Sequence, residues 1–469
     1  MESSTLSFKH PSYKGIIGAA RVDITPPIGI YAKNWGAANH DTMEGIHRPL
    51  TATALTICEE GDEPLVLLSL DLGWWRRRKD EWALRRSLLE ALQLNAARVI
   101  INFTHTHAGP AICPDDADRP GGELINPYLE LLSDRVISVT REALESAEPA
   151  YLEWGTGRCS LAQNRDFPDP DSDRILCGYN PSGLSPDDTL LVGRVTTIAG
   201  KPLAVIVNYA CHPTTLAYDN RLISPDFPGA MREIVEEQTS ALCLTLQGAS
   251  GELAPREQYT ADTSIADRHG RELGYAVLST LEGMLPPAST FEFSGTRESG
   301  ALLGVWNYIS SDQSHRLEAV QDQIELAIQS LPTAIQLKNE MDACEDPVIR
   351  ERLNRKLRIR EGIGTGDTTT MPYWVWQVGD AIILGHPNEA YSHLQVELRR
   401  AFPDIPVVVM NCANGHFGYL PPANLYSENI YPVWQTPFAA GCLERMIERC
   451  IDSIEQIRSM QESPRNYSE

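Results

Sequence analysis

The chain contains 469 residues, of which 42% are hydrophobic, so it is long enough to bury a large core in one domain or in several. Its formal net charge is −23, from 63 acidic and 40 basic residues, which argues against nucleic acid or an anionic membrane surface as a partner. The same balance favours a neutral or cationic small-molecule substrate.

The N-terminal residues 1–14 are polar and are expected to form a flexible arm. They contain neither the basic nor the apolar segment of a signal peptide, and no apolar run in the chain reaches transmembrane length. The 10 cysteines form no Cys-x-x-Cys pair, which disfavours a thiolate zinc site and favours a reducing compartment. These features predict a cytoplasmic protein without an integral membrane segment.

The first part of the chain predicts strands and helices in alternation. A strand is predicted over 15–24, and residues 50–58 and 65–72 form a hairpin-like pair of strands. Residues 77–94 are amphipathic and predict a helix. The β-branched run at 98–103 is too short for a helix and is interpreted as a buried strand.

The remainder of the chain continues in the same way. Further helices are predicted at 126–147, 227–239, 262–283, 389–402 and 434–458. A pair of strands is predicted near 150–163 and another two strands within 374–384, and single strands are predicted at 190–197, 202–211, 241–246 and 406–411. Residues 312–362 are charged and low in glycine, and they predict a helical hairpin that serves as a lid or an interface element. The fold class is therefore α/β, with mixed β-sheets flanked by helices and a helical hairpin insertion.

The strongest functional signal is the stretch Thr104-His105-Thr106-His107-Ala108-Gly109-Pro110, which follows the strand at 98–103. Side chains two apart on a strand point to the same side, so His105 and His107 are expected to face one site. Neutral imidazole is the commonest metal ligand and also a general acid or base near neutral pH.

Other strand exits offer further ligands, namely His212, Glu389 and the loop at 411–419. Two histidines and one carboxylate form a hydrolytic zinc site that leaves a position open for water. Zinc lowers the pKa of that water to about 7 and polarises a carbonyl group. The chain has no His-Glu-x-x-His helix, so the compact metalloprotease motif is absent.

Alternatives at neighbouring positions remain open at this point. A helix that begins at Glu389 would place Glu389 and His393 on one face, so His393 competes as a ligand. Ser250 lies in a Gly-Ala-Ser-Gly turn and is a weaker candidate as a nucleophile, because the pattern is not Gly-x-Ser-x-Gly. The same turn could hold an anion with its backbone N–H groups. The pair Trp74-Trp75 either lines a pocket or packs in the core.

Several stretches, taken in order, resemble the catalytic domain of the neutral/alkaline ceramidase family. They are Val22-Asp23-Ile24-Thr25-Pro26, Thr104 through Pro110, Asn164-Arg165, Asn208 through Pro213, Ser224 through Gly229, Gln247 through Pro255, Pro387-Asn388-Glu389, and Asn414 through Tyr431. The resemblance extends over about residues 15–457. It implies a single zinc hydrolase-like catalytic domain over 15–469, with the helical insertion at 312–362.

The resemblance also implies a set of site residues. In that family one zinc ion is bound by the first histidine of the His-x-His pair, a second histidine, a glutamate and a tyrosine. These ligands fall on His105, His212, Glu389 and Tyr419, so His393 is not among them. The family residues that serve catalysis and substrate orientation fall on His107, Arg165 and Tyr431.

Three departures from the family bear on the substrate. The family's Gly-Asp-x-Ser-Pro reads Gly251-Glu252-Leu253-Ala254-Pro255 here, so Ala254 replaces the active-site serine. The C-terminal immunoglobulin-like domain of the ceramidases is expected to be missing. So is their signal peptide, which argues against ceramide itself as the substrate.

The sequence therefore predicts a Zn²⁺-dependent hydrolase that cleaves an amide bond of a small N-acyl compound with metal-activated water. His107 would transfer the proton to the leaving amine, while Arg165 and Tyr431 would stabilise the oxyanion or hold the substrate. The missing serine leaves two alternatives, which are an esterase or lactonase on the same site and a catalytically silent relative that binds a ligand.

Overall fold

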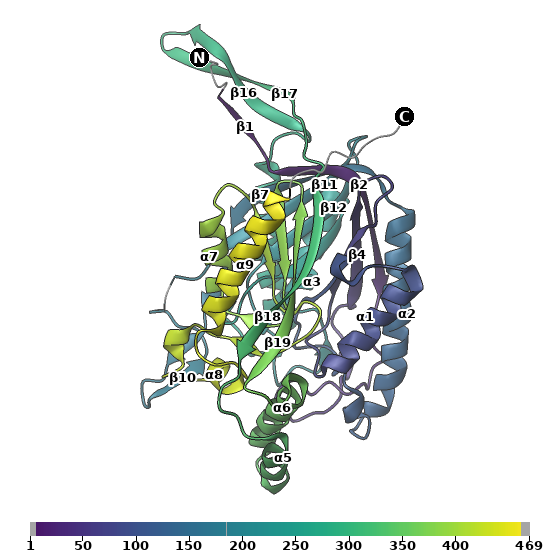
Figure 1. The fold of residues 1–469 in the computed structure, drawn as a ribbon, viewed down its shortest axis with the longest axis vertical. Helices are drawn as coiled ribbons and strands as arrows, with labels where there is room; N and C mark the ends of the chain where they lie inside the picture. The colour runs from purple at the N-terminus through teal and green to yellow at the C-terminus, as the bar shows by residue number, and fades with distance from the viewer. Residues whose placement is uncertain (1–5, 184, 461–469) are drawn as a thin grey trace.

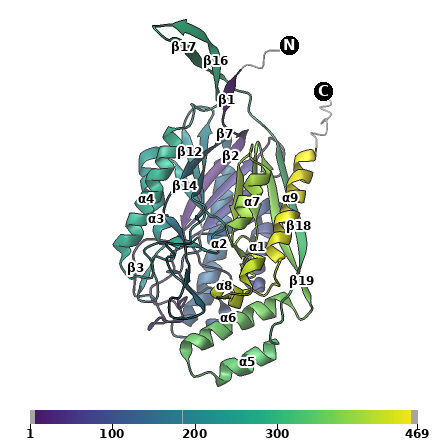
Figure 2. The same cartoon turned by 90° about the vertical axis from the view of Figure 1, so that its left-hand side faces the viewer.

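The computed structural model describes residues 6–183 and 185–460, which form four layers (Figure 1 and Figure 2). The two inner layers are an eight-stranded and a four-stranded β-sheet that pack face to face, and helices cover the outer face of each sheet. This arrangement confirms the predicted α/β fold with mixed sheets flanked by helices.

The strands of the large sheet are β2 (Ser12–Asp23), β4 (Thr51–Cys58), β5 (Leu65–Leu70), β6 (Val99–Phe103), β7 (Glu148–Arg158), β11 (Thr189–Thr197), β12 (Pro202–Tyr209) and β14 (Leu242–Gln247). Their spatial order is β14-β12-β11-β7-β2-β4-β5-β6. The pairs β12–β14 and β5–β6 are parallel, and the other pairs are antiparallel. The parallel pairs therefore lie at the two edges of the sheet, and both lead into loops that carry predicted site residues.

The strands of the small sheet are, in spatial order, β18 (Leu317–Ala327), β19 (Thr368–Val378), β20 (Ala381–Gly385) and β22 (Val407–Met410). Its β20–β22 pair is parallel. The core between the sheets contains the fully buried Trp374 and Trp376 of β19. Their indole N–H groups donate to the carbonyls of Ala96 and Ala97, at 3.1 and 2.8 Å, so neither indole leaves a polar group unsatisfied in the core.

The outer helices are α1 (Arg78–Leu92), α2 (Ile125–Glu145), α3 (Phe227–Thr239) and α4 (Thr263–Glu282) on the large sheet, and α7 (His393–Ala401) and α9 (Cys442–Ser459) on the small sheet. Alternate residues of one strand contact different layers: in β4, Ala54 packs toward α2 and Leu55 toward the small sheet. Within the described residues, no helix is long and apolar enough to cross a membrane.

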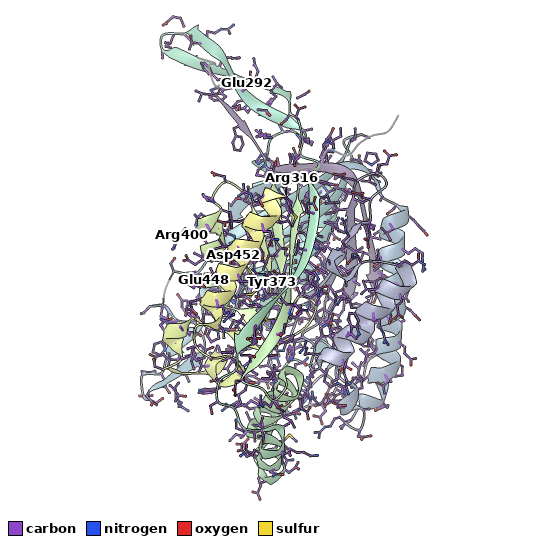
Figure 3. The ribbon with its side chains drawn as sticks, in the orientation of Figure 1. Glu292, Arg316, Tyr373, Arg400, Glu448 and Asp452 are labelled. Carbon is purple, nitrogen blue, oxygen red and sulfur yellow. The ribbon has the colours of Figure 1, made fainter. Side chains whose placement is uncertain are left out.

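Helix α9 is fixed to the small sheet by polar contacts as well as by its apolar face. Arg316, which precedes β18, donates to the carbonyls of the last residues of α9 and of Met460, and Tyr373 of β19 bonds to Ser453 of α9 at 2.7 Å (Figure 3). A cation at the C-terminus of a helix also complements the helix dipole.

Asparagine side chains at the strand exits join the two sheets. Asn102 in β6 donates to the carbonyl of Asn411 at 2.7 Å and accepts from the backbone N–H of Gln247 at 3.0 Å. Asn414 makes two hydrogen bonds to the backbone of β6, each 2.8 Å long. The exits of β6, β14 and β22 are therefore held together, and their loops converge at one end of the sandwich.

Residues 312–362 do not form the predicted helical hairpin over their full length. Helices α5 (Ala334–Ala343) and α6 (Pro347–Ile363) form its second part and lie at one end of the molecule (Figure 1), whereas residues 317–327 are the edge strand β18. The prediction is wrong for β18 because an edge strand exposes one side, so its charged residues resemble those of a surface helix.

The N-terminal region also differs from the prediction. In place of a flexible arm, residues 7–9 form β1 (Ser7–Lys9), which pairs with β16 (Ser289–Glu298), and β16 pairs with β17 (Leu302–Ser310). This three-stranded sheet projects from the body of the molecule (Figure 1). Residues 1–5 of the predicted arm lie outside the described residues. The β16–β17 hairpin was not among the predicted elements.

Two predicted helices have different bounds. Residues 389–390 form the short strand β21 (Glu389–Ala390), which pairs in parallel with β23 (Tyr419–Leu420), and α7 begins only at His393. The helix predicted at 434–458 is divided into α8 (Tyr431–Gln435) and α9, because Pro437 and the left-handed Gly441 interrupt it. The remaining short strands are β3 (Gly45–Ile46), β8 (Ala162–Asn164), β9 (Asp166–Pro168), β10 (Arg174–Cys177), β13 (Leu222–Ile223), β15 (Leu253–Pro255) and β24 (Asn429–Ile430).

Candidate metal centre

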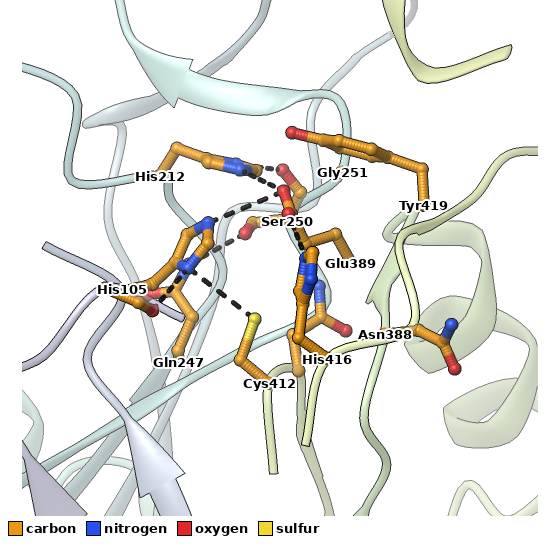
Figure 4. Close-up of polar contacts among 12 residues, drawn as sticks. His105, His212, Gln247, Ser250, Gly251, Asn388, Glu389, Cys412, His416 and Tyr419 are labelled. Atoms are coloured by element: carbon orange, nitrogen blue, oxygen red, sulfur yellow. Dashed lines mark hydrogen bonds and ion pairs between the residues drawn. The ribbon is translucent and has the colours of Figure 1, made fainter. Parts of the chain in front are cut away.

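Three side chains from separate strand exits meet in the interior of the protein (Figure 4). His105 follows β6, His212 follows β12, and Glu389 lies in β21. Their ligand atoms all lie within 4.8 Å of one another, and all three residues are buried. Glu389 Oε2 is 3.0 Å from His212 Nε2 and 3.4 Å from His105 Nε2.

Backbone carbonyls fix the orientation of both imidazoles. His105 Nδ1 lies 2.9 Å from the carbonyl oxygen of Gly73, and His212 Nδ1 lies 2.6 Å from that of Ser250. A carbonyl oxygen can only accept a hydrogen bond, so each Nδ1 carries a proton, and each Nε2 is the ring nitrogen that faces Glu389. Metal-binding histidines are commonly oriented in this way by a bond from the second ring nitrogen.

The structure places His105 and His107 together, but not for the reason that the sequence suggested. Strand β6 ends at Phe103, and His105 has a left-handed backbone with φ of 71°, so the alternation of a strand does not apply. The ring centroids are nevertheless 5.1 Å apart. The backbone N–H of His105 donates to the Leu72 carbonyl at 2.9 Å, which holds the residue in this uncommon conformation.

Glu389 is held in place by a third histidine. His416 Nε2 lies 2.8 Å from Glu389 Oε1, on the opposite oxygen from the one that faces His105 and His212. Burial would raise the pKa of Glu389, but hydrogen bonds and the charge of His105 hold it well below its ordinary value. The carboxylate is therefore ionised, and one of its oxygens remains directed at the two imidazoles.

Tyr419 and Arg165 complete one side of the cluster. The parallel pairing of β21 with β23 places Tyr419 opposite Glu389. Arg165 Nη2 donates to Tyr419 Oη at 3.1 Å and to the Gly251 carbonyl at 2.7 Å, and it lies 3.4 Å from His212 Nε2. The structure thus brings both predicted residues to the cluster.

The cluster has the donor set and the unsatisfied atom that a bound metal ion would require. His105 Nε2 is buried and has no hydrogen-bond partner in the described part of the chain. Burial, assisted by the charge of Arg165, lowers the pKa of His212 to about 4, so this imidazole is neutral. Burial would also lower the pKa of His105, but Cys412 and Glu389 raise it well above its ordinary value. A divalent cation would compete with that proton for Nε2.

His107 and Tyr431 lie on the open side of the cluster. Both ring nitrogens of His107 are buried and lack a hydrogen-bond partner among the described residues. Its ring contacts Trp74 and Trp35, with centroid distances of 4.9 and 5.0 Å. The Tyr431 ring lies 5.7 Å from that of Tyr419. The structure therefore groups all seven predicted site residues.

A cavity of about 360 Å³ opens directly above these residues, with a volume suited to a small molecule. His107, Arg165, Glu389, Tyr419 and Tyr431 contribute to its lining. Helix α6 forms the opposite wall with residues spaced three and four apart, namely Val348, Glu351, Arg352, Arg355, Arg358, Ile359, Gly362 and Ile363. Helix α6 of the helical insertion thus forms a wall of the pocket.

The rival candidates do not join the site. His393 lies in α7, is 44% exposed and pairs with Glu397, so it is not a ligand of the cluster. Ser250 Oγ accepts a hydrogen bond from Gln247 Nε2 at 2.7 Å and does not line the cavity. The Gly-Ala-Ser-Gly turn directs carbonyls, not N–H groups, at His212 and Arg165, so it is not an anion-binding turn.

Sequence reasoning missed two features of the site. His416 was inside the loop named as a source of ligands, but its contact with Glu389 depends on how that loop folds. Trp35 belongs to an irregular segment and lines the cavity beside His107. Both members of the Trp74-Trp75 pair line the cavity. Trp74 lies next to His107, and the buried Trp75 in addition packs on Phe103 in the core.

Comparisons with known proteins agree with this architecture. Residues 16–249 match the family model described as neutral/alkaline non-lysosomal ceramidase, N-terminal. A ceramidase solved in complex with C2 has 17% identity and a TM-score of 0.68, covering 96% of this chain and 76% of its own. The neutral ceramidase from Pseudomonas aeruginosa has 17% identity and a TM-score of 0.66, covering 96% and 75%. At this identity, the two structures show a shared fold.

Proposed function

Because its first half places this chain in the neutral/alkaline non-lysosomal ceramidase family, we propose that the protein is a zinc-dependent hydrolase that cleaves an amide bond in a small N-acyl compound. One observation carries the proposal: a His-His-Glu cluster with an unsatisfied Nε2 lies at the base of a cavity of about 360 Å³. The catalytic unit that we propose extends over residues 15–469, and we propose that ceramide itself is not the substrate.

His105, His212 and Glu389 would hold the ion, with the phenol oxygen of Tyr419 as a fourth donor. Two imidazoles and a carboxylate are a donor set that hydrolytic zinc sites use. When bound, zinc would supply a water molecule of lowered pKa and would polarise the substrate carbonyl. The second ring nitrogens of both histidines are already bound to backbone carbonyls, so the protein has aligned its ligands before the ion arrives.

His107 is the residue best placed to move protons. Its two ring nitrogens have no protein partner in the described part of the chain, and the residue lines the cavity beside the cluster. In our proposal His107 accepts a proton from the attacking water and delivers it to the nitrogen of the leaving amine. Trp35 and Trp74 pack against its ring and restrict its position.

Arg165 and Tyr431 would act on the carbonyl oxygen. Within the described residues Arg165 Nη1 makes no hydrogen bond, while its other nitrogens are bound to Gly251 and Tyr419. Two donors directed at one oxygen would stabilise the negative charge that develops there. A buried arginine is suited to this task because its guanidinium keeps its charge.

Ala254 does not argue for a silent relative. It is buried in β15, which pairs with β8, and it does not line the cavity. The replacement of the family serine therefore removes no group from the pocket itself. An ester or lactone substrate remains the second candidate on the same residues, and a substrate panel separates it from the amide.

The test combines metal analysis with single substitutions. Purified protein should contain about one zinc ion per chain, and chelation should abolish hydrolysis of N-acyl substrates. His105→Ala should lose the metal and reduce kcat/KM by more than about a hundredfold, since it removes a direct ligand. His107→Gln should retain the metal and lower kcat by about a hundredfold or more.

His393→Ala is the matched control, because this exposed histidine lies only four residues from Glu389 in sequence but outside the cluster. It should leave both metal content and turnover unchanged. Protein purified without zinc, or full turnover in His105→Ala, would falsify the proposal. Turnover of ester or lactone substrates alone, with metal present, would favour the second candidate.

A further inference from the structure

The wall of the cavity is rich in arginine, although the whole chain carries a net charge of −23. Seven arginines line it, at positions 76–78 and at Arg165, Arg352, Arg355 and Arg358, against two acidic residues, Glu351 and Glu389. Glu389 belongs to the metal cluster. The remaining lining thus has a strong excess of positive charge, which the composition of the chain does not explain.

Nearby carboxylates neutralise part of this charge only. Asp116 is shared between Arg76 and Arg358, at 3.1 and 2.7 Å, and Arg355 pairs with Glu351 at 3.1 Å. Arg77 pairs with Asp80 and Asp115. Three lining arginines, Arg78, Arg165 and Arg352, have no carboxylate within 4 Å in the described part of the chain. Cations that face a partly dry cavity without a counter-charge are unfavourable until an anion binds there.

Arg355 is the arginine of α6 that contacts residues of the proposed catalytic site. Its guanidinium lies over the ring of Trp74 at 5.3 Å, and the same ring contacts His107 at 4.9 Å. Arg355 Nη1 donates to Tyr431 Oη at 3.4 Å, and Nη2 donates to the Asn34 carbonyl at 2.5 Å. With one further bond from Nε to Glu351, two of its five N–H donors remain for a ligand.

The planar guanidinium recognises carboxylate and phosphate groups with paired hydrogen bonds, which an ammonium group cannot match. The lining contains seven arginines and no lysine. This composition favours recognition of an oxyanion over a general attraction of negative charge.

We propose that the substrate carries an oxyanion, a carboxylate or a phosphate, which binds to Arg355 while the scissile carbonyl lies at the metal cluster. Arg352 of α6 and Arg78 at the start of α1 also line the cavity and would add positive charge around the anionic group. The inference rests on the proposed function and narrows its substrate class to anionic N-acyl compounds. It reverses the expectation of a neutral or cationic substrate that follows from the net charge of the chain.

A structural role for Arg355 is the competing explanation, because its bond to Asn34 also attaches α6 to the body of the protein. The test therefore compares substrates that share the hexanoyl amide and differ in the group beyond its nitrogen. N-hexanoylglycine carries a carboxylate, N-hexanoyl-phosphoethanolamine carries a phosphate, and N-hexanoylethanolamine is neutral. Comparison of the first two substrates also shows whether a carboxylate or a phosphate is the preferred oxyanion.

We expect kcat/KM for one anionic substrate to exceed that for the ethanolamide by about tenfold or more, as hydrogen bonds to a charged group allow. Arg355→Gln should bring this ratio close to one, and Arg355→Lys should restore part of it. Arg350→Gln is the matched control: Arg350 lies on the same helix, is exposed and bonds to the Cys344 carbonyl outside the cavity. It removes the same charge and should leave the ratio unchanged.

Binding measured without turnover keeps the inference testable if catalysis fails. Calorimetry on chelator-treated protein should show that N-hexanoylglycine or inorganic phosphate binds, and that Arg355→Gln weakens binding about tenfold or more while Arg350→Gln does not. Equal turnover of the neutral and anionic substrates, or no anion binding to the treated protein, would overturn the inference. Metal-dependent hydrolysis of the ethanolamide alone would leave the proposed function intact, whereas absence of metal and turnover would reject that function.

Discussion

Glu252 is a buried carboxyl group that takes no direct part in the candidate metal centre. It accepts a hydrogen bond from the backbone N–H of Ser392 at 2.9 Å and another from the Ser392 hydroxyl, just before α7. Burial raises the pKa of Glu252 to about 7 in spite of these bonds. The folded protein therefore holds a proton on this group at a pH where the unfolded chain has lost it.

This shift has a definite sign for stability. Between the ordinary pKa of 4.5 and the folded value of about 7, the folded state binds more protons, so the free energy of unfolding falls as pH rises. Glu252→Gln removes this dependence and keeps an acceptor for Ser392. The free energy of unfolding of the wild type, minus that of the variant, should decrease by about 3 kcal/mol from pH 4.5 to pH 7.5. Urea unfolding of metal-free protein at several pH values measures it, and parallel curves for the two proteins would contradict it.

Single residues also show where sequence reasoning succeeded and where it stopped. The His-x-His pair was recognisable because both imidazoles follow a short buried strand. The left-handed backbone of His105 and the carbonyl of Gly73 that orients its ring could not be predicted, because both depend on contacts with the neighbouring loop. His416 escaped assignment for the same reason: its only distinguishing feature is a contact with a residue 27 positions away.

At the scale of elements, the junction between β6 and the loop at 411–419 positions most of the site. Asn414 is buried, with Oδ1 accepting from the Ile101 N–H and Nδ2 donating to the Val99 carbonyl, each at 2.8 Å. Its φ of 51° is one that asparagine tolerates better than most residues. The side chain therefore pairs with β6 as a neighbouring strand would, and it fixes the loop that carries Cys412, His416 and Tyr419.

Loss of these two hydrogen bonds should lower the stability of the protein measurably. Asn414→Ala leaves one N–H and one carbonyl of β6 buried without a partner, and the free energy of unfolding should fall by about 2–4 kcal/mol. Zinc affinity should fall as well, because the loop also positions Tyr419 and His416. Asn424→Ala, at an exposed position near the same loop, is the control and should change neither quantity by more than about 0.5 kcal/mol. Equal stability of the two variants, measured by urea unfolding, would show that the hydrogen bonds of Asn414 to β6 are dispensable.

The helices that were predicted most accurately are those whose apolar residues face a single neighbouring layer. Helices α2, α3 and α4 each have one continuous buried face and match their predicted ranges within two residues. Strand β18 was mistaken for a helix because acidic residues occur on both of its faces, with Glu318 and Asp322 on one and Glu325 on the other, so it lacks a clear alternation of apolar and polar residues. The bounds near Glu389 were wrong because β21 exists only through its pairing with β23, a contact that local sequence does not encode.

At the scale of the whole molecule, the candidate metal centre lies where the two sheets meet. His105 and His212 follow strands of the large sheet, whereas Glu389 and Tyr419 lie beyond strands of the small sheet. The net charge of the chain was a poor guide to the cavity between them, because the acidic residues lie mainly elsewhere and arginines line the wall. Charge counted over a whole chain describes its average surface and not its pocket.

An ion held by ligands from both sheets should stabilise the complete sandwich. Zinc at a free concentration of one hundred times its Kd should raise the free energy of unfolding by about 2.7 kcal/mol. The melting temperature of wild-type protein should therefore rise with zinc concentration, and that of His212→Ala should not. Differential scanning calorimetry measures both, with His393→Ala as the control that should behave as wild type. A zinc-dependent rise in His212→Ala would place the bound ion elsewhere.

The separation of these ligands along the chain has a consequence for biosynthesis. Glu389 leaves the ribosome roughly 280 residues after His105, which corresponds to about 15–60 s at ordinary rates of translation. During this interval the inner face of the large sheet lacks strands of the small sheet that cover it, and the proposed metal site lacks Glu389. If the proposed site binds a metal ion, binding would consequently be a late event in the maturation of this protein, and a truncated product that ends before β21 would lack the ligand Glu389.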